Sequence, residues 1–163
     1  MGRRISLIGR TSGSCGTIRS MTTAHSSSES DATIDLSTKV IGVLGGTGEQ
    51  GKGLATRFAA AGLSVIIGSR TADRASDVAR EIGENVRGMS NEDTALTSDI
   101  VIVAVPWDGH RELLEKMVTQ LSGKIVVDCV NPLGFDKGGA FALRVPEGSA
   151  AEQAQAVLPD SKV

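Results

Sequence analysis

The chain has 163 residues, 40% of them hydrophobic, which is enough for one globular domain with a substantial core. Its formal net charge of −2 provides no basic field for DNA or an anionic membrane, and three Phe, one Trp and no Tyr provide no stacking platform for single-stranded nucleic acid. Two cysteines and two histidines are too few for a disulfide framework or a zinc cluster, so we expect no metal site, small-molecule partners and a reducing compartment.

Residues 1–38 differ from the rest in composition, being rich in Arg and Ser and poor in acids. Three interpretations stay open: an organellar transit peptide, an N-myristoylation signal at Met1-Gly2 with Ser6, or an upstream start before a true start at Met21. In each case we expect a disordered leader or a mis-called start, because this segment has no core face. No apolar run approaches the roughly 18 residues of a transmembrane helix, so we expect a soluble cytoplasmic protein, organellar if the leader is a transit peptide.

From residue 39 onward, short β-branched runs alternate with amphipathic segments. The predicted strands are residues 39–46, 63–69, 99–106 and 124–130. Five helical segments are predicted. Three have apolar residues at helical spacing and end at a glycine: Leu54 and Phe58 before Gly62, Ala75 to Ile82 before Gly83, and Leu113 to Leu121 before Gly123. The other two begin with a capping box: a short helix at Ser90 and Asp93, and Ala150 to Val157 behind Ser149 and Glu152. This alternation predicts an α/β fold, a Rossmann-type doubly wound parallel sheet over residues 39–163.

The sequence Gly46-x-Gly48-x-x-Gly51 lies between the first strand and the first helix. In such a loop one glycine allows a tight turn, one lets a pyrophosphate approach the backbone, and one lets helix and strand pack closely. The helix N-terminus then offers free N–H groups to the phosphates. This context predicts a dinucleotide-binding loop.

The second strand ends in Ser69-Arg70, where an NAD site carries an acid for the ribose 2′-hydroxyl. A carboxylate there would repel a 2′-phosphate, whereas Ser69 and Arg70 would hold it with charge-assisted hydrogen bonds. Arg70 and Arg74 also stand at a helix start, where the macrodipole disfavours cations unless an anion is near, although Asp73 fills part of that role. We therefore predict NADP(H) rather than NAD(H).

Two further segments are expected at the same edge of the sheet, namely VPWDGH and the long Asn131–Gly148 connection, which we interpret as a binding loop. Trp107 either flanks the nicotinamide or simply packs. We interpret His110 as a polar residue in the first turn of its helix rather than a general base, and Asp128 as the cap of its own turn rather than a substrate ligand. Cys129, buried or beside the cleft, receives no redox role.

VLGGTGEQGKGLATRFAAAGLSVIIGSR, NEDTALTSDIVIVAVPWDGH and the Pro- and Gly-rich stretch after them resemble the NADPH-dependent reductases of the deazaflavin coenzyme F420, over roughly residues 39–163. The resemblance implies an oxidoreductase that transfers hydride between NADP(H) and F420, with no catalytic acid or base that we can name. It also implies which residues bind the cofactor. With the glycines and the strand-end residues already described, these are Gly46, Thr47, Gly48, Glu49, Gln50, Gly51, Ser69, Arg70, Arg74, Val103, Pro106 and Trp107, Arg74 standing where the family has Lys.

Members of this family continue with a further strand and a smaller helical portion that completes the deazaflavin pocket and the homodimer. This chain ends in LPDSKV, which resembles the approach to that strand, so we expect a truncated chain that lacks the C-terminal substrate and dimer portion. Two alternatives stay open. One is another NADP-dependent enzyme of the pyrroline-5-carboxylate reductase or 6-phosphogluconate dehydrogenase type, and the other is a non-catalytic NADP-binding sensor.

Overall fold

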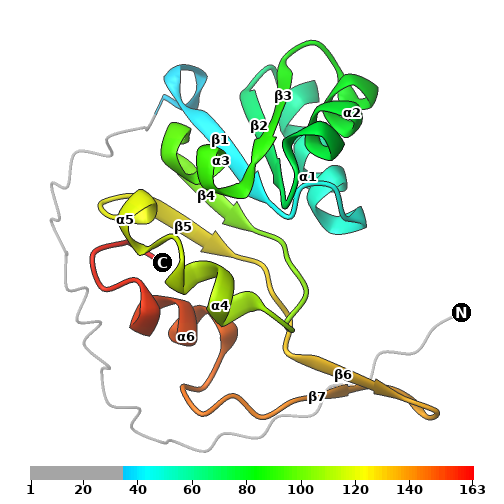
Figure 1. Cartoon of the computed structure of the whole chain (residues 1–163), viewed down its shortest axis with the longest axis vertical. Coiled ribbons are helices and arrows are strands. Elements are labelled where there is room, and N and C mark those ends of the chain that lie inside the picture. The colour runs from blue at the N-terminus through cyan, green and yellow to red at the C-terminus, as the bar shows by residue number, and fades with distance from the viewer. Residues whose placement is uncertain (1–34) are drawn as a thin grey trace, which may run out of the picture. The chain divides into compact units, whose positions relative to one another are not determined.

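The computed structural model describes residues 35–163, and the structural statements below refer to these residues (Figure 1). The three interpretations of the leader concern residues 1–34, which lie outside the described part. Of the leader, only residues 35–38 are described. These positions include a short 3-10 turn, Leu36–Thr38, which Asp35 caps by accepting the Ser37 N–H. No helix in the described part of the chain has the length and apolar content that crossing a membrane requires.

Five parallel strands form the main sheet in the order β3-β2-β1-β4-β5. Their bounds are β1 Val40–Leu44, β2 Ser64–Ser69, β3 Val86–Ser90, β4 Ile100–Val103 and β5 Ile125–Asp128. The strand order reverses between β1 and β4, the switch point at which ligands of doubly wound sheets bind. The prediction of a Rossmann-type parallel sheet is therefore confirmed.

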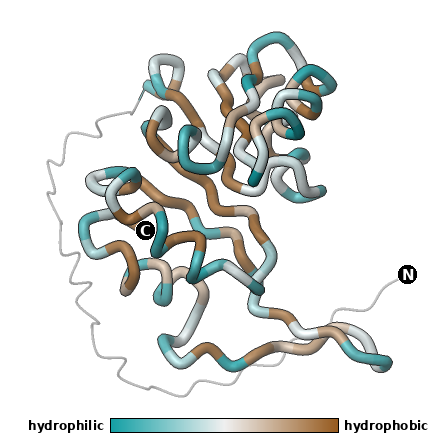
Figure 2. Tube along the Cα trace, in the orientation of Figure 1, coloured by the Kyte–Doolittle hydropathy of each residue, from teal (hydrophilic) through white to brown (hydrophobic). Residues whose placement is uncertain are grey.

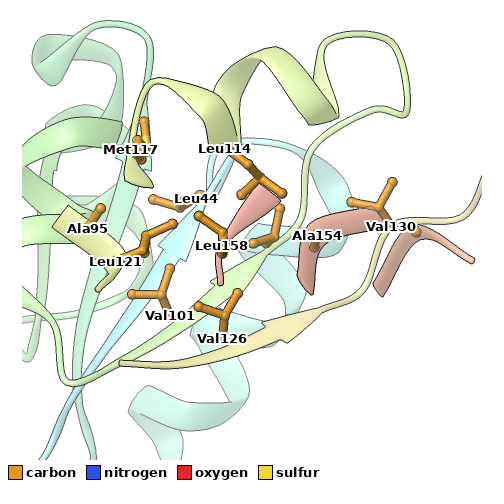
Figure 3. Packing of buried hydrophobic residues seen from close by; sticks show 12 residues of the cluster. Leu44, Ala95, Val101, Leu114, Met117, Leu121, Val126, Val130, Ala154 and Leu158 are labelled. Atoms are coloured by element: carbon orange, nitrogen blue, oxygen red, sulfur yellow. The ribbon is translucent and has the colours of Figure 1, made fainter. Parts of the chain in front are cut away.

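Helices cover both faces of this sheet, and each face has its own apolar cluster. The helices are α1 Glu49–Ala60, α2 Ala72–Ile82, α3 Asn91–Thr97, α4 His110–Glu115, α5 Val118–Leu121 and α6 Ala150–Val157. Residues of α1 and α2 pack on one face, and residues of α3 to α6 pack on the other around Leu44 and Val101 (Figure 3). The strands in the middle of the sheet are hydrophobic along their length, as expected when both faces are covered (Figure 2).

Two short elements differ from the prediction. Residues 86–90, which are absent from the predicted strands, form strand β3 beside β2. The single helix expected from Leu113 to Leu121 is broken into α4 and α5, because the Met117 N–H bonds the carbonyl of Leu114, only three residues back, and closes the first helix. The apolar spacing still holds, since Leu114, Met117 and Leu121 are all buried.

The Asn131–Gly148 connection, which the sequence suggested is a binding loop, contains a β-hairpin. Strands β6 Leu133–Asp136 and β7 Gly139–Ala142 pair antiparallel around a two-residue turn, and the Asp136 carboxylate accepts the Gly138 N–H. The hairpin extends away from the main sheet (Figure 1) and exposes Phe135 and Phe141. Near the last residue, Lys162 forms a parallel bridge with Ile125 at the outer edge of β5.

Candidate functional site

The glycine loop after β1 turns sharply because neighbouring backbone and side chains occupy the space that side chains at Gly45, Gly46 and Gly51 would need. Gly45 has a positive φ of 71°, and the Gly46 N–H bonds the Gly68 carbonyl at the end of β2. A Cβ on Gly46 would lie 2.6 Å from the Ile67 Cβ, and a Cβ on Gly51 would lie 2.7 Å from the Gly46 Cα. A Cβ on Gly48 would meet only the Gly45 carbonyl oxygen, at 3.5 Å, which is an ordinary van der Waals contact. The loop therefore packs as the dinucleotide-binding pattern requires.

Helix α1 begins at this loop with free donors. In the loop and the first turn of α1, the N–H groups of Thr47, Glu49, Gln50 and Gly51 have no acceptor among residues 35–163. A helix of 12 residues adds the positive end of its dipole at the same place. Free N–H groups at such an end suit the oxygens of a phosphate.

A cavity of about 610 Å³ lies on the β2 side of the loop. Ser69, Arg70 and Arg74 form part of its wall together with Thr47 and Gly48. The Ser69 side chain is buried, whereas both arginines are exposed. The cavity is also lined by two acids and a lysine, namely Asp108, Glu112 and Lys116, of which the last two form an ion pair at 2.7 Å. The arginines therefore border the same cavity as Thr47, one of the residues with a free N–H group, while Glu49 and Gln50 line a smaller cavity beside it.

A second cavity, of about 370 Å³, lies on the β5 side of the same loop. Its polar wall is made by the start of α1, where the Gln50 side-chain amide donates to the Cys129 carbonyl at 3.3 Å. Its apolar wall consists of Pro106, Trp107, Leu133 and Phe135. The hairpin therefore contributes to the site, and ordinary ligand pockets have volumes in this range.

The structure brings together most of the residues that were predicted to bind the cofactor. Nine of the twelve line one or both cavities: Thr47, Gly48, Glu49, Gln50, Ser69, Arg70, Arg74, Pro106 and Trp107. Gly46 and Gly51 line neither cavity, but their lack of a side chain lets the loop pack closely against β2 and α1. Val103 lines neither cavity, because its side chain is fully buried in the core and its carbonyl accepts the Cys129 N–H.

Sequence reasoning missed a buried polar cluster behind Trp107. The His110 side chain is fully buried, and its Nε2 lies 2.6 Å from an Asp128 carboxylate oxygen while its Nδ1 lies 3.2 Å from the Gln153 side-chain oxygen. His110 does stand in the first turn of its helix, as predicted, but its partners lie 18 and 43 residues away along the chain and could not be named from the sequence. Asp128 does cap its own turn, since its other oxygen accepts the Val130 N–H.

This cluster affects both the wall of the smaller cavity and the charge on His110. The Trp107 and His110 rings stack with centroids 5.6 Å apart. Burial lowers the pKa of His110, but the hydrogen bond and negative charge of Asp128, with a smaller contribution from Gln153, outweigh burial and raise this pKa above its ordinary value. Nearby, burial raises the pKa of the Cys129 thiol and keeps it protonated.

The model of the family described as "NADP oxidoreductase coenzyme F420-dependent" matches residues 40–132. An F420-dependent NADP reductase of Methanothermobacter thermautotrophicus is 40% identical over 127 residues, 72% of this chain and 55% of that protein. The crystal structure of a candidate F420-dependent NADP reductase from Arthrobacter sp. FB24 matches with a TM-score of 0.66 and 30% identity, covering 76% of this chain and 59% of that one.

A pyrroline carboxylate reductase of Plasmodium falciparum matches with a TM-score of 0.53, covers 76% of this chain and 39% of that one, and at 19% identity shares the fold alone. The chain spans 55% to 60% of the length of the curated F420-dependent NADP reductases that it matches. The family match covers β1 to β5 with the glycine loop, Ser69-Arg70 and Trp107, the same segments whose motifs suggested the resemblance. This chain therefore belongs to the family of coenzyme F420-dependent NADP oxidoreductases.

Proposed function

We propose that this chain is the NADP(H)-binding part of an oxidoreductase that transfers hydride between NADP(H) and the deazaflavin coenzyme F420. Residues 39–163 form the nucleotide-binding domain in this proposal. The observation that carries it is the larger cavity, in which Ser69 and Arg70 stand at the end of β2 where an NAD site would hold an acid, and which Arg74 of α2 also lines. Membership of the family, and the F420-dependent NADP reductases among its relatives, support the choice of acceptor.

The two cavities divide the cofactor between them in this proposal. The pyrophosphate lies on the free N–H groups of α1, and the 2′-phosphate lies against Ser69, Arg70 and Arg74. The nicotinamide passes Gly48 into the smaller cavity, which shares this residue with the larger one. Trp107, Leu133 and Phe135 then provide an apolar wall for the facing ring.

Hydride transfer between two rings asks little of acids and bases. A hydride leaves the nicotinamide of NADPH and adds to the deazaflavin ring, and a proton from solvent completes the reduced product. The protein must hold the two rings face to face at reacting distance and keep water away. An apolar wall that includes Trp107 and Phe135 suits that task.

Replacing Arg70 with alanine should weaken NADPH binding by at least about tenfold while changing NADH binding little, because a charge-assisted hydrogen bond to the 2′-phosphate is worth about 1.5–3 kcal/mol. A titration followed by the fluorescence of Trp107, the only Trp in the chain, measures both dissociation constants. Arg57→Ala is the matched control, since Arg57 is exposed near the end of α1 and lines neither cavity. Equal losses for the two nucleotides would refute the 2′-phosphate role.

The acceptor is tested by mixing the chain with NADPH and F420 and following the visible absorbance of the deazaflavin. Loss of that absorbance at the rate of NADPH oxidation supports the proposal. Tight NADPH binding without turnover on any acceptor would instead favour the sensor alternative or the expected truncation of the chain. A cytoplasmic location and a homodimer of the full-length protein belong to the same proposal, and light scattering on a family member of full length tests the dimer.

A further inference from the structure

Among the polar side chains that line the larger cavity and are absent from the predicted set of binding residues, Asn91 is the buried one, whereas Asp108, Glu112 and Lys116 are exposed. This residue opens α3 directly after Ser90, and Ser90 pairs with Ser69 in the register of β2 and β3. Asn91 lies in the cavity wall and is only 8% exposed. It therefore stands beside the end of β2, where the proposed function places the 2′-phosphate.

The orientation of the Asn91 amide is fixed by the glycine loop. Its Oδ1 accepts the Gly45 N–H at 3.2 Å, and only the oxygen of an amide can accept from an N–H. Gly68 leaves the room for this contact, because a Cβ there would lie 2.6 Å from Oδ1. Asn91 thus ties the start of α3 to the first glycine of the loop, and its amino group points away from that bond.

The amino group has no partner among the described residues. Every fully buried side-chain nitrogen or oxygen in residues 35–163 has a hydrogen-bond partner, so the Asn91 Nδ2, which has none, keeps some access to solvent. A residue that is otherwise buried and lies in a cavity wall exposes this atom to the cavity. A donor in such a place gains a hydrogen bond when an acceptor enters.

We propose that Asn91 is a further nucleotide-binding residue, whose amide donates to the ribose-phosphate group of NADP(H) beside Ser69 while its oxygen holds the loop at Gly45. The inference rests on the proposed NADP(H) site. It also gives Asn91 a role in specificity. An amide donor suits the phosphate of NADP(H), whereas a carboxylate at this place would repel it and could accept only from the hydroxyl of NAD(H).

The variant Asn91→Asp separates this role from a purely structural one, since it keeps an acceptor for the Gly45 N–H while it removes the amide donors and adds a negative charge. We expect its dissociation constant for NADPH to rise by at least about tenfold and that for NADH to change less than about threefold, from loss of a charge-assisted bond and the added repulsion. The matched control is Gln120→Glu, the same amide-to-acid change on α5 at a residue that lines neither cavity. This control should bind both nucleotides like the parent chain.

An unchanged ratio of the two dissociation constants in Asn91→Asp would overturn the inference and leave the proposed function standing. Failure of the parent chain to bind NADPH would overturn both. A second measurement does not depend on the variant. In the ¹⁵N–¹H spectrum of the parent chain, the side-chain amide signals of Asn91 should shift on titration with NADPH, and signals that stay unmoved at saturation would also overturn the inference.

Discussion

Gly51→Ala should reduce NADPH binding by well over tenfold. The new methyl group would lie 2.7 Å from the Gly46 Cα and 2.8 Å from the Gly45 carbonyl oxygen, and both are backbone atoms that cannot turn aside. Helix and loop must therefore separate, at a cost of about 1–3 kcal/mol typical of overpacking. That separation moves the free N–H groups of α1 away from the loop. Titration with NADPH measures the loss of binding, and urea denaturation measures the loss of stability.

Gly53→Ala on the same helix is the matched control. A Cβ at Gly53 would meet nothing within 4 Å, and the residue is exposed. Because alanine favours a helix interior over glycine, this variant should gain about 0.5–1 kcal/mol of unfolding free energy and bind NADPH unchanged. Should the two variants bind NADPH equally well, the close packing of loop and helix would not matter for binding, and the interpretation of the glycine motif would be wrong.

The motif-bearing part of the fold could be predicted from the sequence because each signal there is local. Strand β1, the glycine turn and α1 follow one another within about twenty residues, and glycine spacing and apolar periodicity report them directly. Ser69 and Arg70 could be predicted to lie beside the glycine loop because β2 runs parallel to β1, so that both strands end at the same edge of the sheet. Strand β3 was missed because Arg87 and Gly88 interrupt its apolar pattern, and Gly88 is needed there to let α2 pack closely.

What the sequence could not provide is the set of contacts between distant segments. Asn91 reaches Gly45 across 46 positions, and His110 reaches Gln153 across 43. Polar residues at helix starts are ordinarily caps or solvated groups, so nothing in the local pattern distinguishes these from others. The β6–β7 hairpin is a partial exception. Its turn, Asp136 to Gly139, carries an Asp and two glycines, which is a hairpin signal that could have been read.

Removing the charge of Asp128 should have the largest effect on stability. In Asp128→Asn the Val130 N–H keeps an acceptor, but a fully buried His110 loses its counterion. Breaking a buried pair in this way typically costs about 3–5 kcal/mol while the remaining partner stays charged. Asp160→Asn makes the same change at an exposed residue and should leave the unfolding free energy within about 0.5 kcal/mol of the parent.

The effect of Asp128→Asn should depend on pH with a defined sign. The pKa of His110 is raised in the folded chain, so the folded state binds a proton more tightly than the unfolded state, whose histidine titrates near 6.5. The stabilisation is therefore complete below pH 6.5 and is lost as the pH rises through the folded pKa. The groups that set this pKa are Asp128 on β5, Gln153 on α6 and, opposing them, Arg111 on α4. Urea denaturation at several pH values should show the parent and variant converging toward alkaline pH.

Trp107 reports the same titration without unfolding the protein. Its ring stacks on His110 at 5.6 Å, and a protonated imidazole in contact with an indole quenches its fluorescence. Emission of the parent chain should therefore rise as the pH passes through the raised pKa of His110, and in Asp128→Asn the rise should occur at lower pH, because burial then lowers the pKa unopposed by the carboxylate. A titration that is the same in both chains would mean that Asp128 does not hold the proton on His110. The wall of the smaller cavity at Trp107 would then be independent of the charge behind it.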